Sequence, residues 1–246
     1  MKLFVDLGNA RIKWAESGPG VWRTGAELLG DQPVSTLLDT TWRELSSPEQ
    51  IIVSSVAPVE QLRDLERWLQ QRWARQAHVI QSRKTMLGVR NTYDQPATLG
   101  TDRWAALIAA HQLTKSPVSV VDCGTAVTMD ALTANGEFLG GVIFPGLRLL
   151  GLSLVQGTGA IRETAGSANR FPGQSTADAV AAGSHYGLAG AIERVLQEYR
   201  CRLGNNMEVL FTGADASVVM QNVRVGAREV PDLVLKGLAA IADELG

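Results

Sequence analysis

The sequence has little of what would suit a secreted, membrane-bound or nucleic-acid-binding protein. Only two cysteines occur, Cys123 and Cys201, without metal-site spacing, which favours a reducing compartment and two structural thiols. The formal net charge is −2, so no basic field exists to hold nucleic acid or an anionic membrane. Every apolar run is interrupted by charge well short of the roughly 18 residues that a transmembrane helix requires. We therefore predict a cytoplasmic protein with neither a nucleic-acid nor a membrane partner.

The most legible stretch covers residues 118–141. A β-branched run leads into Asp122, a tight turn follows at Gly124-Thr125, and a second apolar run ends in an Asn-Gly hairpin signal at 135–136. Asp122 therefore stands at the end of a strand, beside a turn that exposes backbone N–H groups and a hydroxyl. Such a place can hold phosphate and a cation, although an ordinary β-hairpin has the same pattern.

The start of the chain repeats this plan. An apolar strand ends at Asp6, a Gly8-Asn9 turn follows, and a return strand carries Lys13. Nearly half of the chain separates Asp6 from Asp122. We therefore predict two similar halves that face each other across a cleft, each supplying one Asp-x-Gly loop. With 246 residues, 45% of them hydrophobic, the chain is long enough to bury two small cores.

Between these two loops, the pattern predicts a strand over 51–56 and an amphipathic helix over 59–77. Trp68 and Trp73 lie on that helix at helical spacing, which indicates core packing rather than a binding stripe. The polar segment 82–100 is longer than most connections inside a domain, and loops of that length are often functional.

The segment 82–100 leads into Gly100-Thr101-Asp102-Arg103, which opens a mostly buried helix. Thr101 is the predicted N-cap, and Asp102 suits the positive end of the helix dipole. Helix capping and an exposed ion pair would explain these residues. The dipole disfavours a cation at Arg103, however, so this residue is expected to have another role.

The second half of the chain also contains readable helix signals. The pattern predicts a helix over 147–156, a loop over 157–174, and a long helix through Leu203 that begins with the capping box Ser175 to Asp178. Thr212-Gly213 forms a strand–glycine–helix junction, which suits phosphate or adenosine but also occurs as a plain βα turn. A final helix is expected over 231–245.

Five of these motifs, in this order and approximate spacing, resemble those of type III pantothenate kinases. They are Asp6-x-Gly8-Asn9-x-x-x-Lys13, Gly100-Thr101-Asp102-Arg103, Asp122-x-Gly124-Thr125-Ala126-x-Thr128, Gly140-Gly141-x-Ile143-x-Pro145-Gly146 and Thr212-Gly213. The resemblance runs from the first strand to the last helix. Two positions depart from the family pattern: Ala10 stands where Thr or Ser is usual, and Ala214 where a second Gly is common.

The resemblance implies an α/β fold of two similar ribonuclease H-like domains, as in actin-like ATPases. Each domain is expected to be a mixed sheet with flanking helices, and the two to surround an ATP cleft. We place the domains at residues 1–114 and 115–246. The implied reaction is ATP-dependent phosphorylation of pantothenate to 4'-phosphopantothenate, the first step of coenzyme A biosynthesis.

The resemblance also implies roles for individual residues. ATP is expected to bind at Asp6, Gly8, Asn9, Lys13, Gly124 and Thr125. Asp6 is expected to bind Mg²⁺, which takes one or two carboxylates plus phosphate oxygens, and Asp122 a monovalent cation, K⁺ or NH₄⁺.

The acceptor side of the site follows from the same resemblance. Asp102 matches the general base and Arg103 a clamp for the carboxylate of pantothenate. The other substrate-binding positions are Tyr93, Gly100, Thr101 and Thr176, the last from the partner subunit of a homodimer.

Two alternatives remain open at this point. The chain could be a non-catalytic, regulatory relative of the family, although a binding module would have no need of Lys13, Asp102 and Arg103 together. It could also be a superfamily kinase that acts on another small alcohol. The loop Arg90-Asn91-x-Tyr93 favours pantothenate, by resemblance alone.

Overall fold

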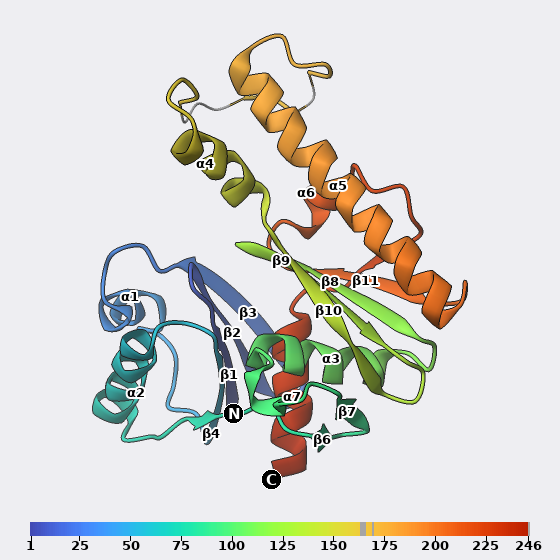
Figure 1. Cartoon of the computed structure of the whole chain (residues 1–246). Coiled ribbons are helices and arrows are strands. Elements are labelled where there is room, and N and C mark those ends of the chain that lie inside the picture. The colour runs from blue at the N-terminus through green and yellow to red at the C-terminus, as the bar shows by residue number, and fades with distance from the viewer. Residues whose placement is uncertain (163–165, 169, 246) are drawn as a thin grey trace. The chain divides into compact units, whose positions relative to one another are not determined.

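The computed structural model describes residues 1–162, 166–168 and 170–245 (Figure 1). The chain forms two compact units: unit 1 comprises Met1–Leu113 and Asp232–Gly246, and unit 2 comprises Thr114–Pro231. The expected division at residues 114 and 115 differs from these units at the C-terminus. There, helix α7 (Leu233–Leu245) packs against helix α3 (Thr101–Leu113) and strand β1 (Lys2–Leu7) of unit 1. A contact so distant in sequence leaves no local signal.

Unit 1 is built on a mixed sheet in the strand order β3-β2-β1-β4-β5. Strand β2 is antiparallel to both β1 and β3, whereas β4 runs parallel to β1 and β5 runs parallel to β4. Helices α1 and α2 follow β3 and β4. The bounds are β2 (Arg11–Gly18), β3 (Val21–Leu28), α1 (Val34–Thr41), β4 (Gln50–Ser55), α2 (Val59–Trp73) and β5 (His78–Val79).

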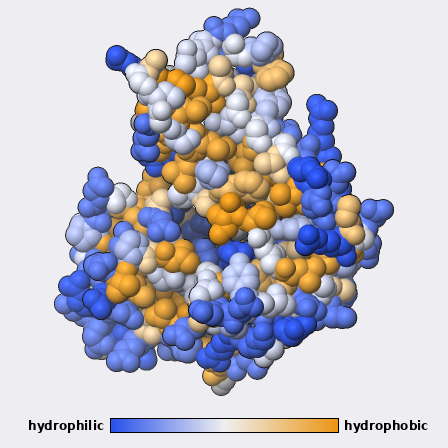
Figure 2. Space-filling view, viewed as in Figure 1, coloured by the Kyte–Doolittle hydropathy of each residue, from blue (hydrophilic) through white to orange (hydrophobic). Residues whose placement is uncertain are grey.

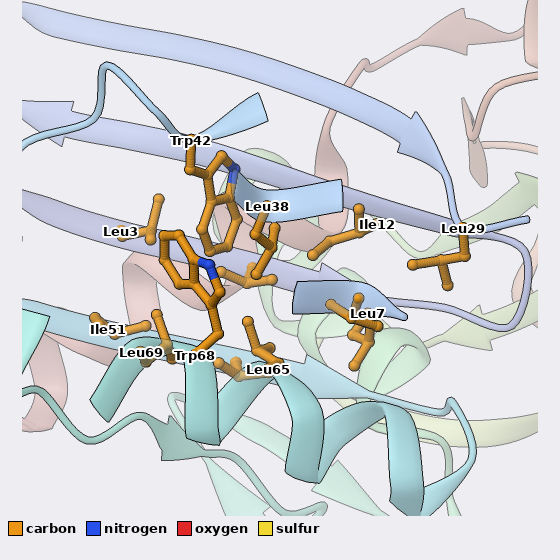
Figure 3. Packing of buried hydrophobic residues seen from close by; sticks show 13 residues of the cluster. Leu3, Leu7, Ile12, Leu29, Leu38, Trp42, Ile51, Leu65, Trp68 and Leu69 are labelled. Carbon is orange, nitrogen blue, oxygen red and sulfur yellow. The ribbon is translucent and has the colours of Figure 1, made fainter. Parts of the chain in front are cut away.

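One face of this sheet packs on α1 and α2 (Figure 3). Leu3, Val5 and Leu7 alternate along β1 into this core, as the period of a strand requires. Trp68 is 5% exposed and lies edge-on to Trp42, their ring centroids 5.7 Å apart. Trp73 stacks on the same indole, with the ring centroids 6.0 Å apart. The prediction that the α2 tryptophans belong to the core is therefore confirmed.

Unit 2 carries a sheet with strands in the order β12-β11-β8-β9-β10. Strands β8, β9 and β10 are antiparallel neighbours, and β11 and β12 continue the sheet in parallel. The predicted Asn-Gly hairpin turn joins β9 to β10, with Gly136 at φ 80°. The bounds are β8 (Val118–Cys123), β9 (Ala126–Leu132), β10 (Glu137–Pro145), β11 (Glu208–Thr212) and β12 (Arg228–Glu229).

The described part of unit 2 contains the helices α4 (Leu147–Gly157), α5 (Thr176–Leu203) and α6 (Ala216–Met220). The predicted start of α5 is confirmed, since the Ser175 hydroxyl accepts the Asp178 N–H at 3.1 Å. Of the loop predicted over 157–174, residues 163–165 and 169 lie outside the described residues. Among the helices described, none combines the length and the apolar character that crossing a membrane demands.

Candidate active site

In unit 1, Asp6, Lys13 and Ser54 lie in one row across three strands. The register pairs Asp6 of β1 with Lys13 of β2 on one side and with Ser54 of β4 on the other. Directly paired residues point to the same face of a sheet, so these three side chains share a face. Asp6 is only 6% exposed and Ser54 is fully buried. The turn after β1 is closed by the Gly8 N–H, which donates to the Arg11 carbonyl at 2.9 Å, and leaves Asn9 exposed.

Helix α3 begins on the same face of the unit 1 sheet. The Thr101 hydroxyl is 3.0 Å from the Ser54 hydroxyl, accepts the Ser55 N–H at 3.1 Å and donates to the Ser55 carbonyl at 3.1 Å. Thr101 is therefore not the N-cap, and that prediction is wrong. Gly100 precedes the helix, and its carbonyl accepts the Trp104 N–H at 3.0 Å. The Thr101 hydroxyl bonds to the backbone of β4, because this strand lies within hydrogen-bond distance of it, and not to an N–H group of its own helix.

Asp102 and Arg103 follow in the first turn of α3. The Asp102 carboxylate accepts the Arg103 N–H at 2.7 Å and lies over Gly100, where a Cβ atom would come within 2.5 Å of its Oδ1. Any side chain at residue 100 would displace this carboxylate, so glycine suits the position. Arg103 is 8% exposed, so a guanidinium is held largely out of solvent at the helix start.

The segment between β5 and α3 contains a short hairpin and a 3₁₀ turn: β6 (Thr85–Met86), β7 (Val89–Asn91) and η1 (Pro96–Thr98). The Tyr93 hydroxyl accepts a hydrogen bond from the Arg103 guanidinium at 3.3 Å, and the guanidinium carbon lies 5.9 Å from the ring centre. The structure therefore brings together Tyr93 and Arg103, which the sequence separates by the whole 3₁₀ turn.

Asn91 orders this segment, a role that the sequence reasoning did not assign to it. Its side chain is fully buried. Its amide donates to the Pro96 carbonyl at 3.0 Å, and its oxygen accepts the Tyr93 N–H at 3.0 Å. Asparagine in a polar loop is the signal for such a local turn, but its burial becomes visible only in the fold.

In unit 2, Asp122 occupies a row like that of Asp6. The register pairs Asp122 of β8 with Thr128 of β9 and with Thr212 of β11. Gly213 follows at φ 94°, and a Cβ on it would lie 2.4 Å from Asp122 Oδ1. The backbone of this strand–helix junction therefore lies directly against the Asp122 carboxylate, which only glycine allows.

The Gly124-Thr125 turn follows Asp122 and is held at both ends. The Gly124 N–H donates to the Ala126 carbonyl at 3.1 Å, and the Thr125 carbonyl accepts the Gly146 N–H at 2.9 Å. The Thr125 side chain is exposed. This leaves its hydroxyl at the surface of a turn whose backbone is fixed.

The two cysteines differ. Cys123 is fully buried, and its burial, followed by the charge of Asp122, raises the pKa of its thiol far above the ordinary value. It is a structural, unreactive thiol, as predicted. Cys201 is exposed on α5, so the prediction of a second structural thiol is wrong. The helix turns that residue outward, which its neighbours in sequence do not reveal.

Thr176 is the first residue of α5 and is exposed. It lines a cavity of about 300 Å³ between α4 and α5, together with Arg148 and His185. Across the residues with described coordinates, no group of three or more His, Cys, Asp or Glu side chains gathers as a metal centre. Asp6 at the end of β1 and Asp122 near the end of β8 are each a single carboxylate that offers oxygen donors.

Two mixed sheets, each with an aspartate row and a glycine turn at the end of its first strand, define a protein of two similar α/β domains. A glucokinase from Streptomyces griseus, solved with glucose and AMPPNP, has this fold: TM-score 0.53, 12% identity, coverage of 99% of both chains. The family model of type III pantothenate kinase matches residues 2–198.

Curated relatives carry the same family name over nearly the full length. The type III pantothenate kinase of Nitrosospira multiformis is 40% identical over 98% of this chain and 91% of its own. That of Nitrosococcus oceani is 35% identical over 99% of this chain and 94% of its own. The chain therefore belongs to the type III pantothenate kinase family.

Proposed function

We propose that this protein transfers the γ-phosphoryl group of ATP to the primary hydroxyl of pantothenate and so forms 4'-phosphopantothenate, the first step of coenzyme A biosynthesis. One observation carries the proposal beyond family membership. Within unit 1, the start of α3 with Asp102 and Arg103 is hydrogen-bonded to the strand that pairs with Asp6. Phosphoryl transfer depends mainly on positioning, so the general base, here Asp102, must keep a fixed position relative to the carboxylate proposed to lie beside the phosphates, here Asp6.

On the acceptor side, Asp102 is the general base. Its carboxylate accepts the proton of the pantothenate hydroxyl as the oxygen attacks the γ-phosphorus. Arg103 binds the carboxylate of pantothenate, because a planar guanidinium offers two parallel N–H donors to it. Tyr93 supports this arginine, with its hydroxyl 3.3 Å from Nη1. The backbone at Gly100 and Thr101 completes the acceptor site.

On the nucleotide side, Lys13, Gly8 and Asn9 of unit 1 and Gly124 and Thr125 of unit 2 bind the phosphates. Their backbone N–H groups, amide, hydroxyl and ammonium are donors suited to phosphate oxygens. Mg²⁺ bound to ATP would supply positive charge to neutralise the phosphates. Asp6 is its proposed protein ligand, and Asp122 is the proposed ligand of K⁺ or NH₄⁺.

We also propose a homodimer. Large apolar side chains are exposed on unit 2, where Ile143 is 63% and Phe171 67% accessible. Figure 2 shows hydrophobic surface over the part of the molecule that carries α4 and α5 in Figure 1. Apolar groups exposed together on a surface often mark protein contacts. Thr176, at the start of α5, would then contribute to the pantothenate site of the partner subunit. Sedimentation that finds a fully active monomer at assay concentration would contradict this shared site.

An ATP-coupled assay across a panel of alcohols tests the proposed reaction. Pantothenate is expected to be turned over, with sugars and simple alcohols inactive. Turnover of another alcohol instead would identify a kinase of different specificity. ATP binding without turnover of any acceptor would identify a non-catalytic, regulatory relative.

A further inference from the structure

Ser54 is a fully buried serine in the apolar strand β4. Its neighbours Ile52 and Val53 are typical of a buried parallel strand, and a serine there packs less apolar surface than a valine would. A buried hydroxyl is normally retained for a hydrogen bond. Here its partner is the Thr101 hydroxyl, 3.0 Å away at the start of α3.

The direction of these hydrogen bonds follows from the chemistry of a hydroxyl, which has one proton and two lone pairs. Thr101 donates its single proton to the Ser55 carbonyl and accepts the Ser55 N–H. It can therefore only accept from Ser54, and the Ser54 hydroxyl is the donor. These three bonds, which we name the hydroxyl link, use the whole hydrogen-bonding capacity of the Thr101 side chain.

The hydroxyl link connects two parts of the site. Ser54 pairs with Asp6 in the register of β4 and β1, on the phosphate side. Thr101 directly precedes Asp102 and Arg103, on the acceptor side. The link is thus a short path of hydrogen bonds between the aspartate row of the sheet and the residues proposed to deprotonate and hold pantothenate.

We propose that Ser54 and Thr101 are positioning residues, which hold the start of α3 against β4 so that Asp102 meets the acceptor hydroxyl in reacting geometry. This inference rests on the proposed function. It also gives Thr101 a different role from that implied by the family resemblance, since its hydroxyl has no capacity left to bind pantothenate.

Three variants test the link. Thr101→Val keeps the shape and removes the hydroxyl, Ser54→Ala removes the donor, and Thr101→Ser keeps the hydroxyl. We expect kcat to fall about 10- to 100-fold in the first two with little change in KM for ATP, because small displacements of reacting groups have effects of this size. Thr101→Ser should restore most of the rate. The double variant Ser54→Ala/Thr101→Val should lose no more of its kcat than Thr101→Val alone, because both changes break the same hydroxyl link.

Ser119→Ala is the matched control, since Ser119 is also fully buried and its hydroxyl makes no hydrogen bond within the described residues. It should leave kcat unchanged. Hydrogen exchange of the amides at the start of α3 gives a second readout that needs no activity. Exchange should rise in Ser54→Ala and not in Ser119→Ala.

Equal kcat and equal exchange in Ser54→Ala and Ser119→Ala would overturn the inference, whatever happens to the melting temperature. If the wild-type protein phosphorylates no pantothenate, the proposed function fails separately. The exchange measurement then still decides whether the hydroxyl link orders α3.

Discussion

The two sheets share one topology but differ in what their central rows carry. The orders β3-β2-β1-β4-β5 and β10-β9-β8-β11-β12 match strand for strand in order and direction. In unit 1, Asp6 stands between Lys13 and Ser54, whereas in unit 2, Asp122 stands between Thr128 and Thr212. A lysine stands beside the aspartate in the first row, whereas the residues beside the aspartate in the second row are both threonines. The repeated strand plan is thus the shared scaffold, and the residues beside each aspartate distinguish the two rows.

A second difference lies in the segments that follow each sheet. From β5 to α3 the chain passes through β6, β7 and η1 and brings Tyr93 to Arg103. From β12 to α7 only a short connection remains. Insertions in surface connections are tolerated because they do not disturb the core, so specificity for an acceptor is most easily gained there. The two segments can therefore be compared by mutation.

The largest effect is expected at the helix that follows the longer segment. Asp102→Asn keeps shape and removes proton-accepting power, so kcat should fall about 10²- to 10⁴-fold, with ATP binding nearly unchanged. Asp232→Asn, before α7, is the control and should retain full turnover. Single-turnover rates and melting temperatures of both variants distinguish a role of Asp102 in the chemical step from a role in stability. Near-normal turnover in Asp102→Asn, with a stability loss of about 0.5–1 kcal/mol, would reduce Asp102 to a helix-dipole partner.

The next effect compares the two rows. Lys13→Ala should lower kcat/KM for ATP about 10- to 100-fold, because hydrogen bonds to charged groups contribute roughly 1.5–3 kcal/mol. Thr128→Val, at the matching position in unit 2, should change it much less. The melting temperature of Lys13→Ala should stay near that of the wild type. A large fall would instead assign Lys13 to a structural ion pair.

Gly213→Ala should act on stability. Its φ of 94° and the approach of a Cβ to Asp122 Oδ1 both oppose a side chain. We expect a loss of about 1–3 kcal/mol in the free energy of unfolding by denaturant. Ser55→Ala, at the last residue of β4, should cost less than about 0.5 kcal/mol. Equal losses would show that the two junctions are not specialised.

The all-oxygen row of unit 2 predicts a cation effect. Activity should rise when Na⁺ is exchanged for K⁺ or NH₄⁺ at constant ionic strength, which keeps screening at about 8 Å in physiological salt. Asp122→Asn should abolish this response, whereas Lys13→Ala should keep it at lower activity. Indifference of the wild type to the exchange would remove the monovalent site.

The smallest effect is expected at the start of α5, where Asp178 lies in the first turn. The Ser167 N–H, the Ser175 hydroxyl and Arg170 hold the pKa of Asp178 below its ordinary value. The charged form is therefore favoured in the folded state. Its stabilisation is present above the unfolded pKa of about 3.9 and is lost as pH falls through the lower folded value. The difference in melting temperature between wild type and Asp178→Asn should shrink below about pH 4. A constant difference would contradict this contribution.

Local chemistry was sufficient for much of the fold and part of the site. Alternating apolar residues that end at Asp6 and Asp122, the Asn-Gly turn before β10 and the Ser175 cap of α5 all depend on neighbours within a few residues. Their strands, turn and helix could be predicted from the sequence for that reason. The order of the motifs also indicated the type III pantothenate kinase family, because this order is a property of the sequence and does not depend on contacts in the fold.

Tertiary structure decided the rest. Thr101 follows a glycine and precedes an aspartate, which locally indicates a cap, yet β4 offers its hydroxyl better partners at Ser54 and Ser55. The C-terminal helix α7 joins unit 1 because its apolar side packs on α3 and β1, a contact between the two ends of the chain. The sequence by itself determined which groups the site contains. Only long-range packing decided which of them lie against one another, because a hydrogen bond is made with whichever partner the fold brings within reach.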